Sequence, residues 1–161
     1  MSENVTYFEI NPFIVFNTPQ GRLDNWKALR HKITELNDRD AMEMVAEYWG
    51  LAPLSNFSYN PEAPEYWPSP WEMVSHGDWC RYIVAVGMEF TFRLAGWAPE
   101  RMEIVFFRDY DISEEVMVLK IDGQYALNYS IGKVVDWPQT EKIITGKWQY
   151  KGRSYVSLDD K

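Results

Sequence analysis

The sequence of 161 residues is poor in reactive side chains, with one cysteine, Cys80, and two histidines, His31 and His76. A single thiol cannot form an intramolecular disulfide, and it excludes zinc or iron–sulfur sites that need several thiolates. Any reaction that requires an imidazole must use one of the two histidines. The sequence also has no glycine-rich phosphate loop and no His/Cys cluster, so we expect no cofactor and no metal.

Basic residues are outnumbered, because 16 Lys and Arg stand against 24 Asp and Glu, a formal net charge of −8. This balance opposes non-specific binding to nucleic acids or anionic membrane surfaces. No apolar run approaches the roughly 18 residues of a spanning helix, and the sequence does not start with a signal-peptide pattern. We therefore expect a cytoplasmic protein with no nucleic-acid partner and no membrane partner.

Apolar residues are plentiful, at 46% of the chain, and aromatic residues make up 16%. This composition excludes global disorder and is sufficient for one sizeable core. We expect a single domain over residues 1–161. It consists of an N-terminal arm and helical hairpin (1–50), a strap rich in proline and aromatic residues (51–76), and a helix followed by an antiparallel sheet (77–161).

The N-terminal 50 residues change pattern twice. Residues 7–16 are aromatic and β-branched with a proline in the middle, which predicts an extended arm or edge strand. Apolar residues then recur at three- and four-residue spacing, which predicts a helix over residues 24–36. A second helix is predicted from the Asn37-Asp38 cap to Gly50, so the two helices form a hairpin.

The strap at residues 51–76 contains five prolines interleaved with aromatic residues and is predicted to be irregular. Tyr66, Trp67 and Trp71 are its candidate partner-binding residues, because rigid backbone presents large aromatic faces there. The alternative is that these aromatic side chains cover the core.

The remaining residues predict a helix followed by strands. Apolar residues lie nearly all round the run from Gly77 to Gly96, which is typical of a central, buried helix. Asp122-Gly123 is a hairpin signal. Helices followed by an antiparallel sheet make an α+β fold. The β-type runs are residues 102–107, 116–121, 125–129, 142–145, 147–150 and 154–157.

Cys80 follows Gly77-Asp78-Trp79, where the central helix is expected to begin. In the first turn, free backbone amides and the helix dipole lower the pKa of a thiol and favour the thiolate. Asp78 is a reasonable N-cap, although its carboxylate opposes a thiolate nearby. The alternative is that Cys80 is only a small buried apolar group.

Residues 77–137 resemble the bacterial transglutaminase-like cysteine proteinases, a branch of the papain-like and transglutaminase-like superfamily. The resemblance implies a transglutaminase-like fold with Cys80 at the position of the nucleophile. It places Asn128 at the position of the catalytic aspartate and Val116 at that of the catalytic histidine. The matching stretches are Gly77-Asp78-Trp79-Cys80, Arg93 to Asp109, Val116-Met117-Val118-Leu119 and Ala126-Leu127-Asn128.

The departures from the family pattern predict a degenerate site. Val116 stands where the family has its histidine, no histidine follows His76, and Trp79 is an extra residue. The first hypothesis is therefore a protein-binding or structural module with a protein partner or self-association. The alternative is an active cysteine hydrolase or acyl transferase, with His76 as the base and Asn128 orienting it. Glu115 is a poorer candidate base.

Two further features of the sequence concern metal binding and origin. An acidic loop could hold a hard cation through oxygen ligands, but it lacks the glycine and terminal glutamate of a calcium loop, and we interpret it as a solvated turn. The compact, tryptophan-rich chain also resembles proteins of tailed bacteriophages. The loop residues are Asp109, Asp111, Glu114 and Glu115.

Overall fold

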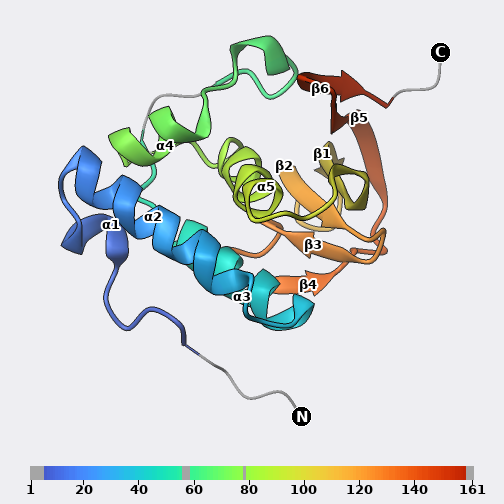
Figure 1. Cartoon of the computed structure of the whole chain (residues 1–161). Helices are drawn as coiled ribbons and strands as arrows, with labels where there is room; N and C mark the ends of the chain where they lie inside the picture. Colours follow the sequence, from blue (N-terminus) through green and yellow to red (C-terminus); the bar gives the residue numbers. More distant parts are fainter. Residues whose placement is uncertain (1–5, 56–58, 78, 159–161) are drawn as a thin grey trace.

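The computed structural model describes residues 6–55, 59–77 and 79–158 (Figure 1). In these residues, helices pack on one face of a six-stranded antiparallel sheet with strand order β4-β3-β2-β1-β5-β6. The predicted α+β class is confirmed. The elements are α1 (Pro12–Val15), α2 (Pro19–Ile33), α3 (Asp38–Gly50), η1 (Pro64–Tyr66), α4 (Pro70–His76), α5 (Val84–Leu94), η2 (Pro99–Arg101), β1 (Met102–Asp109), β2 (Glu114–Ile121), β3 (Tyr125–Leu127), β4 (Val134–Asp136), β5 (Lys142–Lys151) and β6 (Ser154–Ser157).

The N-terminal helices begin where side chains cap them. Asn37 accepts a hydrogen bond from Asp40 N at 2.8 Å, and α3 runs to Gly50 as predicted. Thr18 accepts from Gly21 N at 3.0 Å, so α2 begins at Pro19, five residues before the predicted start. A cap followed by proline at the first helical position satisfies one free amide and removes another.

Two predictions of irregular or extended chain were wrong for the same reason. Within 7–16, the Asn11 side chain accepts from Phe13 N at 2.9 Å, and Pro12 opens the short helix α1. Within the strap, Ser69 and Glu72 form a reciprocal capping box, and Pro70 opens α4. In both places proline occupies the first turn of a helix, where its missing amide hydrogen costs nothing.

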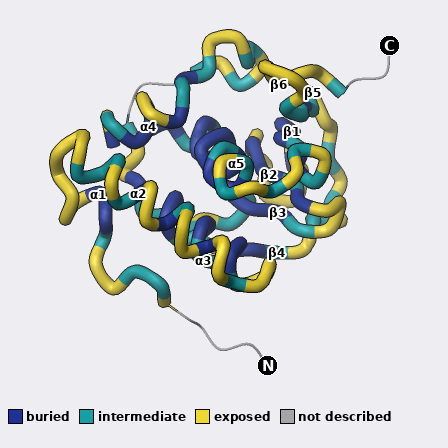
Figure 2. The backbone as a smooth tube through the Cα atoms, viewed as in Figure 1, coloured by how far each residue is buried: buried dark blue, intermediate teal, exposed yellow. Residues whose placement is uncertain are grey.

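Helix α5 lies at the centre of the molecule, between the other helices and strands β1 and β2 (Figure 1). It is buried along most of its length, as Figure 2 shows. Thr91 Oγ1 accepts hydrogen bonds from Trp26 Nε1 and Trp49 Nε1, each at 3.0 Å, and donates to Gly87 O. A Cβ at Gly87 would lie 2.7 Å from the Trp49 ring, so α3 approaches α5 closely because position 87 has no side chain. The predicted central helix is present but shorter.

Strands β1 and β2 carry apolar side chains on both faces of the sheet. Met117, Leu119 and Ile121 face the helices and belong to the main core. The intervening residues of β2 point to the opposite face, because successive side chains of a strand alternate. On that face a second, smaller cluster is covered by Tyr129 and Trp137. Its buried members are Val105, Phe107, Val116 and Val118.

The rest of the sheet differs from prediction in three places, the first being that β3 ends at Leu127 and not at residue 129. Residues 142–145 and 147–150 belong to one strand, β5, which accommodates one extra residue through a register shift opposite Phe106 and Phe107. Strand β4 was not predicted. The predicted hairpin turn is present, with φ of +56° at Asp122 and +68° at Gly123. In the part of the chain described here, no helix is both long and apolar enough to cross a membrane.

Candidate functional site

Cys80 lies on the turn that leads into α5, not in the first turn of the helix. The strap pairs with the residue before it: Trp79 N donates to Pro53 O at 3.0 Å, and Ser55 N donates to Trp79 O at 2.9 Å. This pairing holds Trp79 in an extended conformation, and α5 begins only at Val84. The expected first-turn position of the thiol is therefore corrected. The predicted N-cap, Asp78, lies outside the described residues.

The chain enters this segment through a left-handed glycine at the end of α4. Gly77 has φ of +85° and ends the helix, a conformation that residues with a Cβ rarely adopt. Arg22, on α2, donates from Nε to Val74 O at 2.9 Å and from Nη2 to Ser75 O. A Cβ at position 77 would lie 2.9 Å from Arg22 Nε. Arg22 therefore fixes the end of α4, a role that the sequence did not reveal.

The Cys80 side chain is free but buried, with 6% exposed. Two phenols lie close enough to interact with it electrostatically. Burial raises the pKa of Tyr59, as does negative charge at Glu72 and Cys80. Burial likewise raises the pKa of Tyr82, and negative charge at Glu115, Cys80 and Glu114 adds to the increase. The thiol therefore lies within electrostatic range of two phenols, Tyr59 and Tyr82.

His76 is the last residue of α4 and is exposed. Its ring stacks on Trp79, with centroids 6.0 Å apart and an interplanar angle of 13°. Tyr59 also stacks on Trp79, with ring centroids 6.4 Å apart. Within the described residues, no hydrogen bond joins His76 to Cys80. The structure thus places the His76 ring against Trp79, the residue before Cys80, and the contact it shows for this ring is with the indole and not with the thiol.

Asn128 directly follows β3 and is 3% exposed, with φ of +74°. Its Nδ2 donates to Arg81 O at 3.0 Å and to Met117 O at 2.9 Å. Its Oδ1 accepts from Arg81 Nη1. The side chain that was expected to orient an imidazole is therefore bound to backbone carbonyls and a guanidinium. Arg81 was not recognised from the sequence, because only the fold brings it to Asn128.

Val116 lies on the wrong side of the sheet to meet the thiol. It pairs with Phe107 in the small cluster on the face away from α5. By the alternation of β2, the helix-facing residue beside it is Glu115, whose charge acts on Tyr82. A side chain at position 116 therefore cannot serve Cys80, and an exposed carboxylate occupies the helix-facing position.

The three aromatic candidates of the strap have different environments. Trp67 packs edge-on against Trp148 at 5.4 Å and Tyr155 at 5.1 Å, so it covers the core. Trp71 is 51% exposed and contacts Trp26 through one edge at 6.2 Å. Tyr66 is 74% exposed. Two of the three side chains are therefore accessible at the surface.

Solved structures of LapG from Legionella pneumophila have a similar arrangement of helices and sheet. The calcium-bound form has a TM-score of 0.67 and 14% identity, covering 87% of this chain and 80% of that chain. A further LapG structure has a TM-score of 0.67 and 15% identity, with the same coverage. The EGTA-treated form has a TM-score of 0.66 and 15% identity, covering 87% of this chain and 77% of that chain. The fold is transglutaminase-like. No family model and no curated protein matches the sequence.

The acidic side chains of the described residues do not gather into a metal-binding cluster. The described residues contain no group of three or more His, Cys, Asp or Glu side chains that could hold a metal ion. Asp109, from the acidic loop, is completely buried and accepts hydrogen bonds from Tyr129 Oη at 2.6 Å, Thr140 Oγ1 at 3.1 Å and Asp111 N at 2.9 Å. The expectation of a solvated turn was therefore wrong for Asp109, while the other three acidic residues are exposed.

Proposed function

We propose that this chain is a catalytically degenerate transglutaminase-like fold that acts as a protein-binding or structural module. One observation carries the proposal: the amide of Asn128 is engaged by Arg81 and Met117, where a thiol hydrolase needs a group that orients an imidazole. Arg81, which binds this amide, is the residue that directly follows Cys80.

The chemistry of the thiol supports the same conclusion. In a thiol hydrolase, a hydrogen-bonded base takes the thiol proton so that the sulfur becomes nucleophilic. Cys80 is buried, and no imidazole within the described residues is hydrogen-bonded to it. Glu115 would be a poor substitute, because a carboxylate is a weak base for a thiol and its charge disfavours the thiolate.

The exposed aromatic residues support the binding half of the proposal. Tyr66 and Trp71 place large amphipathic rings at the surface of the strap, and such rings are enriched in protein interfaces. Trp67 serves the core instead. The partner is a protein or a second copy of the chain. An origin in a tailed bacteriophage and a place in the cytoplasm or a virion stay predictions from the sequence.

The alternative is an active cysteine hydrolase or acyl transferase. The stacking of His76 on Trp79 favours it, because this contact holds an imidazole against the residue next to Cys80. In that case His76 would take the thiol proton, and the sulfur would attack the carbonyl carbon of an amide. The C–N bond would then break to give a thioester, and His76 would return the proton to the departing amine.

Alkylation of Cys80 by iodoacetamide at neutral pH separates the two functions. We expect the native protein to react at least about tenfold more slowly than a short cysteine peptide, with the difference disappearing in denaturant. His76→Ala is the matched variant and should leave the native rate unchanged. A native rate above that of the peptide, reduced by His76→Ala, would show an activated thiol and overturn the degenerate-site proposal.

Light scattering and pull-down test the binding half. We expect either a stable oligomer or a stoichiometric partner, retained by Cys80→Ala and lost when Tyr66 and Trp71 are both changed to Ser. A monomer that captures no partner would contradict this part of the proposal, whatever the alkylation rate.

A further inference from the structure

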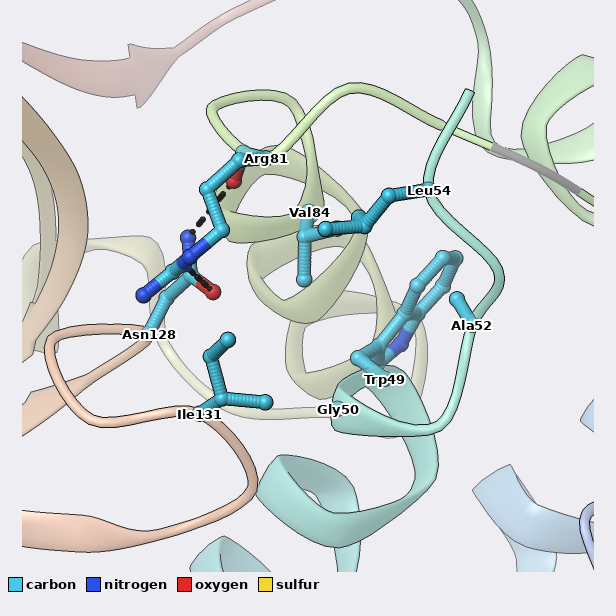
Figure 3. A pocket seen from close by; sticks show the side chains of 8 residues that line it. All are labelled: Trp49, Gly50, Ala52, Leu54, Arg81, Val84, Asn128 and Ile131. Carbon is cyan, nitrogen blue, oxygen red and sulfur yellow. Dashed lines mark hydrogen bonds between the residues drawn. The ribbon is translucent and has the colours of Figure 1, made fainter. Parts of the chain in front are cut away.

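A small pocket opens beside Arg81, on the side of the site formed by the ends of α3 and β3 (Figure 3). Its volume is about 30 Å³. Figure 3 shows Arg81 and Asn128 together on one side, with aliphatic and aromatic side chains around the rest. The lining residues are Trp49, Gly50, Ala52, Leu54, Arg81, Val84, Asn128 and Ile131.

The pocket has a tight wall and an apolar rim. The end of α3 meets the loop that follows β3, where a Cβ on Gly50 would lie 2.6 Å from Gly132 Cα, so this contact leaves no space for a side chain at position 50. Leu54, which follows α3, and Ile131, which lies between β3 and β4, are each 55% exposed. These two aliphatic side chains give the pocket an apolar rim that is open to a ligand.

Arg81 is the charged group of the pocket. Its guanidinium has five N–H donors and, within the described residues, makes one hydrogen bond, to Asn128 Oδ1. It forms no ion pair with a described carboxylate. Burial lowers the pKa of Arg81, and the charge of Glu114 only partly opposes this effect. A half-buried guanidinium with unused donors is suited to a bidentate contact with a carboxylate.

We propose that this pocket binds the C-terminal carboxylate of a partner polypeptide whose last residue is aliphatic. The inference rests on the proposed binding function and names the chemistry of the partner. A volume of about 30 Å³ accommodates roughly two water molecules, so it fits a carboxylate but not a whole residue. The last side chain therefore lies on the rim between Leu54 and Ile131.

A C-terminal residue matches both the guanidinium of Arg81 and the aliphatic rim better than an acidic side chain within a chain does. In a terminal leucine, the carboxylate and the aliphatic side chain leave the same Cα, so one reaches Arg81 while the other covers the rim. A glutamate inside a chain would place its polar backbone on Leu54 and Ile131, leaving peptide groups unpaired against apolar surface. The observations therefore favour a free chain end.

The test is an NMR titration of the ¹⁵N-labelled Cys80→Ala protein with the free acid of N-acetyl-Ala-Ala-Leu and with its C-terminal amide. We expect the acid to shift the backbone resonances of Gly50, Leu54 and Ile131, and the amide to bind at least about tenfold more weakly. Ile131→Ser, at an exposed rim position, should weaken the acid severalfold. Arg81→Gln should abolish the difference between acid and amide, whereas Arg39→Gln, on the exposed face of α3, should preserve it.

Equal binding of acid and amide would overturn the proposal, as would shifts confined to other surfaces or no shift up to roughly 10 mM peptide. An equal response to sodium acetate would also overturn it, because the rim would then contribute nothing. Since the thiol is absent from the tested protein, this result is independent of whether Cys80 is reactive.

Discussion

At the scale of single residues, Thr91 connects three helices through one hydroxyl group. Trp26 from α2 and Trp49 from α3 both donate their indole N–H to it, and both rings are buried. The hydroxyl hydrogen goes to Gly87 O at 2.7 Å, within α5. A buried donor that loses its acceptor keeps its desolvation penalty, so this one oxygen determines whether two indoles are satisfied.

We expect Thr91→Val to lower the free energy of unfolding by about 2–5 kcal/mol, because two buried N–H groups lose their acceptor while the side-chain volume is kept. Thr91→Ser is the matched control, since it retains the hydroxyl and loses one methyl group, at a cost of about 1 kcal/mol. Urea unfolding at equilibrium measures both. Equal losses in the two variants would contradict this explanation.

At the scale of elements, the position of Cys80 depends more on the end of α4 and on the strap than on α5. Arg22 fixes the last turn of α4, Gly77 reverses the chain, and the strap pairs with Trp79. The thiol is therefore held by contacts from α2 and from residues 53–55, on both sides of the turn. Loss of either contact should loosen the segment that keeps the sulfur buried.

We expect Arg22→Met to speed hydrogen exchange in the last turn of α4 and at Trp79, and to raise the alkylation rate of Cys80 severalfold. The reason is that the carbonyls of Val74 and Ser75 lose their donors. Arg39→Met removes an exposed pair with Glu43 on α3 and serves as the control. If both variants exchange and react like the wild type, Arg22 does not hold this turn.

At the scale of the whole molecule, one continuous core joins the helical half to the sheet. It extends from Trp26 and Trp49, through α5, to Met117 and Leu119 on β2. Tyr155 on β6 donates to Glu89 Oε1 at 2.6 Å, and Glu89 pairs with Arg93 at 3.0 Å, so α5 is also tied to the edge strand. Among the described residues, neither the helical half nor the sheet has a separate core as large as this shared one.

We therefore expect the whole chain to unfold in one cooperative transition, as the prediction of a single domain requires. Tryptophan fluorescence and far-UV circular dichroism should give coincident urea curves, because indoles of both halves share the core. Two separated transitions, with fluorescence changing before helicity, would show that the N-terminal helices and the sheet are independent units.

The amino-acid sequence by itself determined the α+β class, the hairpin at Asp122-Gly123 and the bounds of α3, because capping, turn chemistry and apolar spacing act over a few residues. It indicated the transglutaminase-like fold through local motifs. Helices α1 and α4 could have been found from their Asn-Pro and Ser-Pro starts, but the prolines were interpreted as interruptions of regular structure.

The tertiary structure decided what surrounds the thiol. That the strap holds Trp79 out of the helix, that Arg81 binds Asn128, and that Val116 faces away from α5 all follow from contacts between segments distant in sequence. The face of a strand residue depends on register, and a shift of one residue reverses it. Because residues 116–119 of β2 are apolar on both faces, their pattern does not show which face meets α5. The groups around Cys80 were therefore decided only by the packing of the sheet against α5.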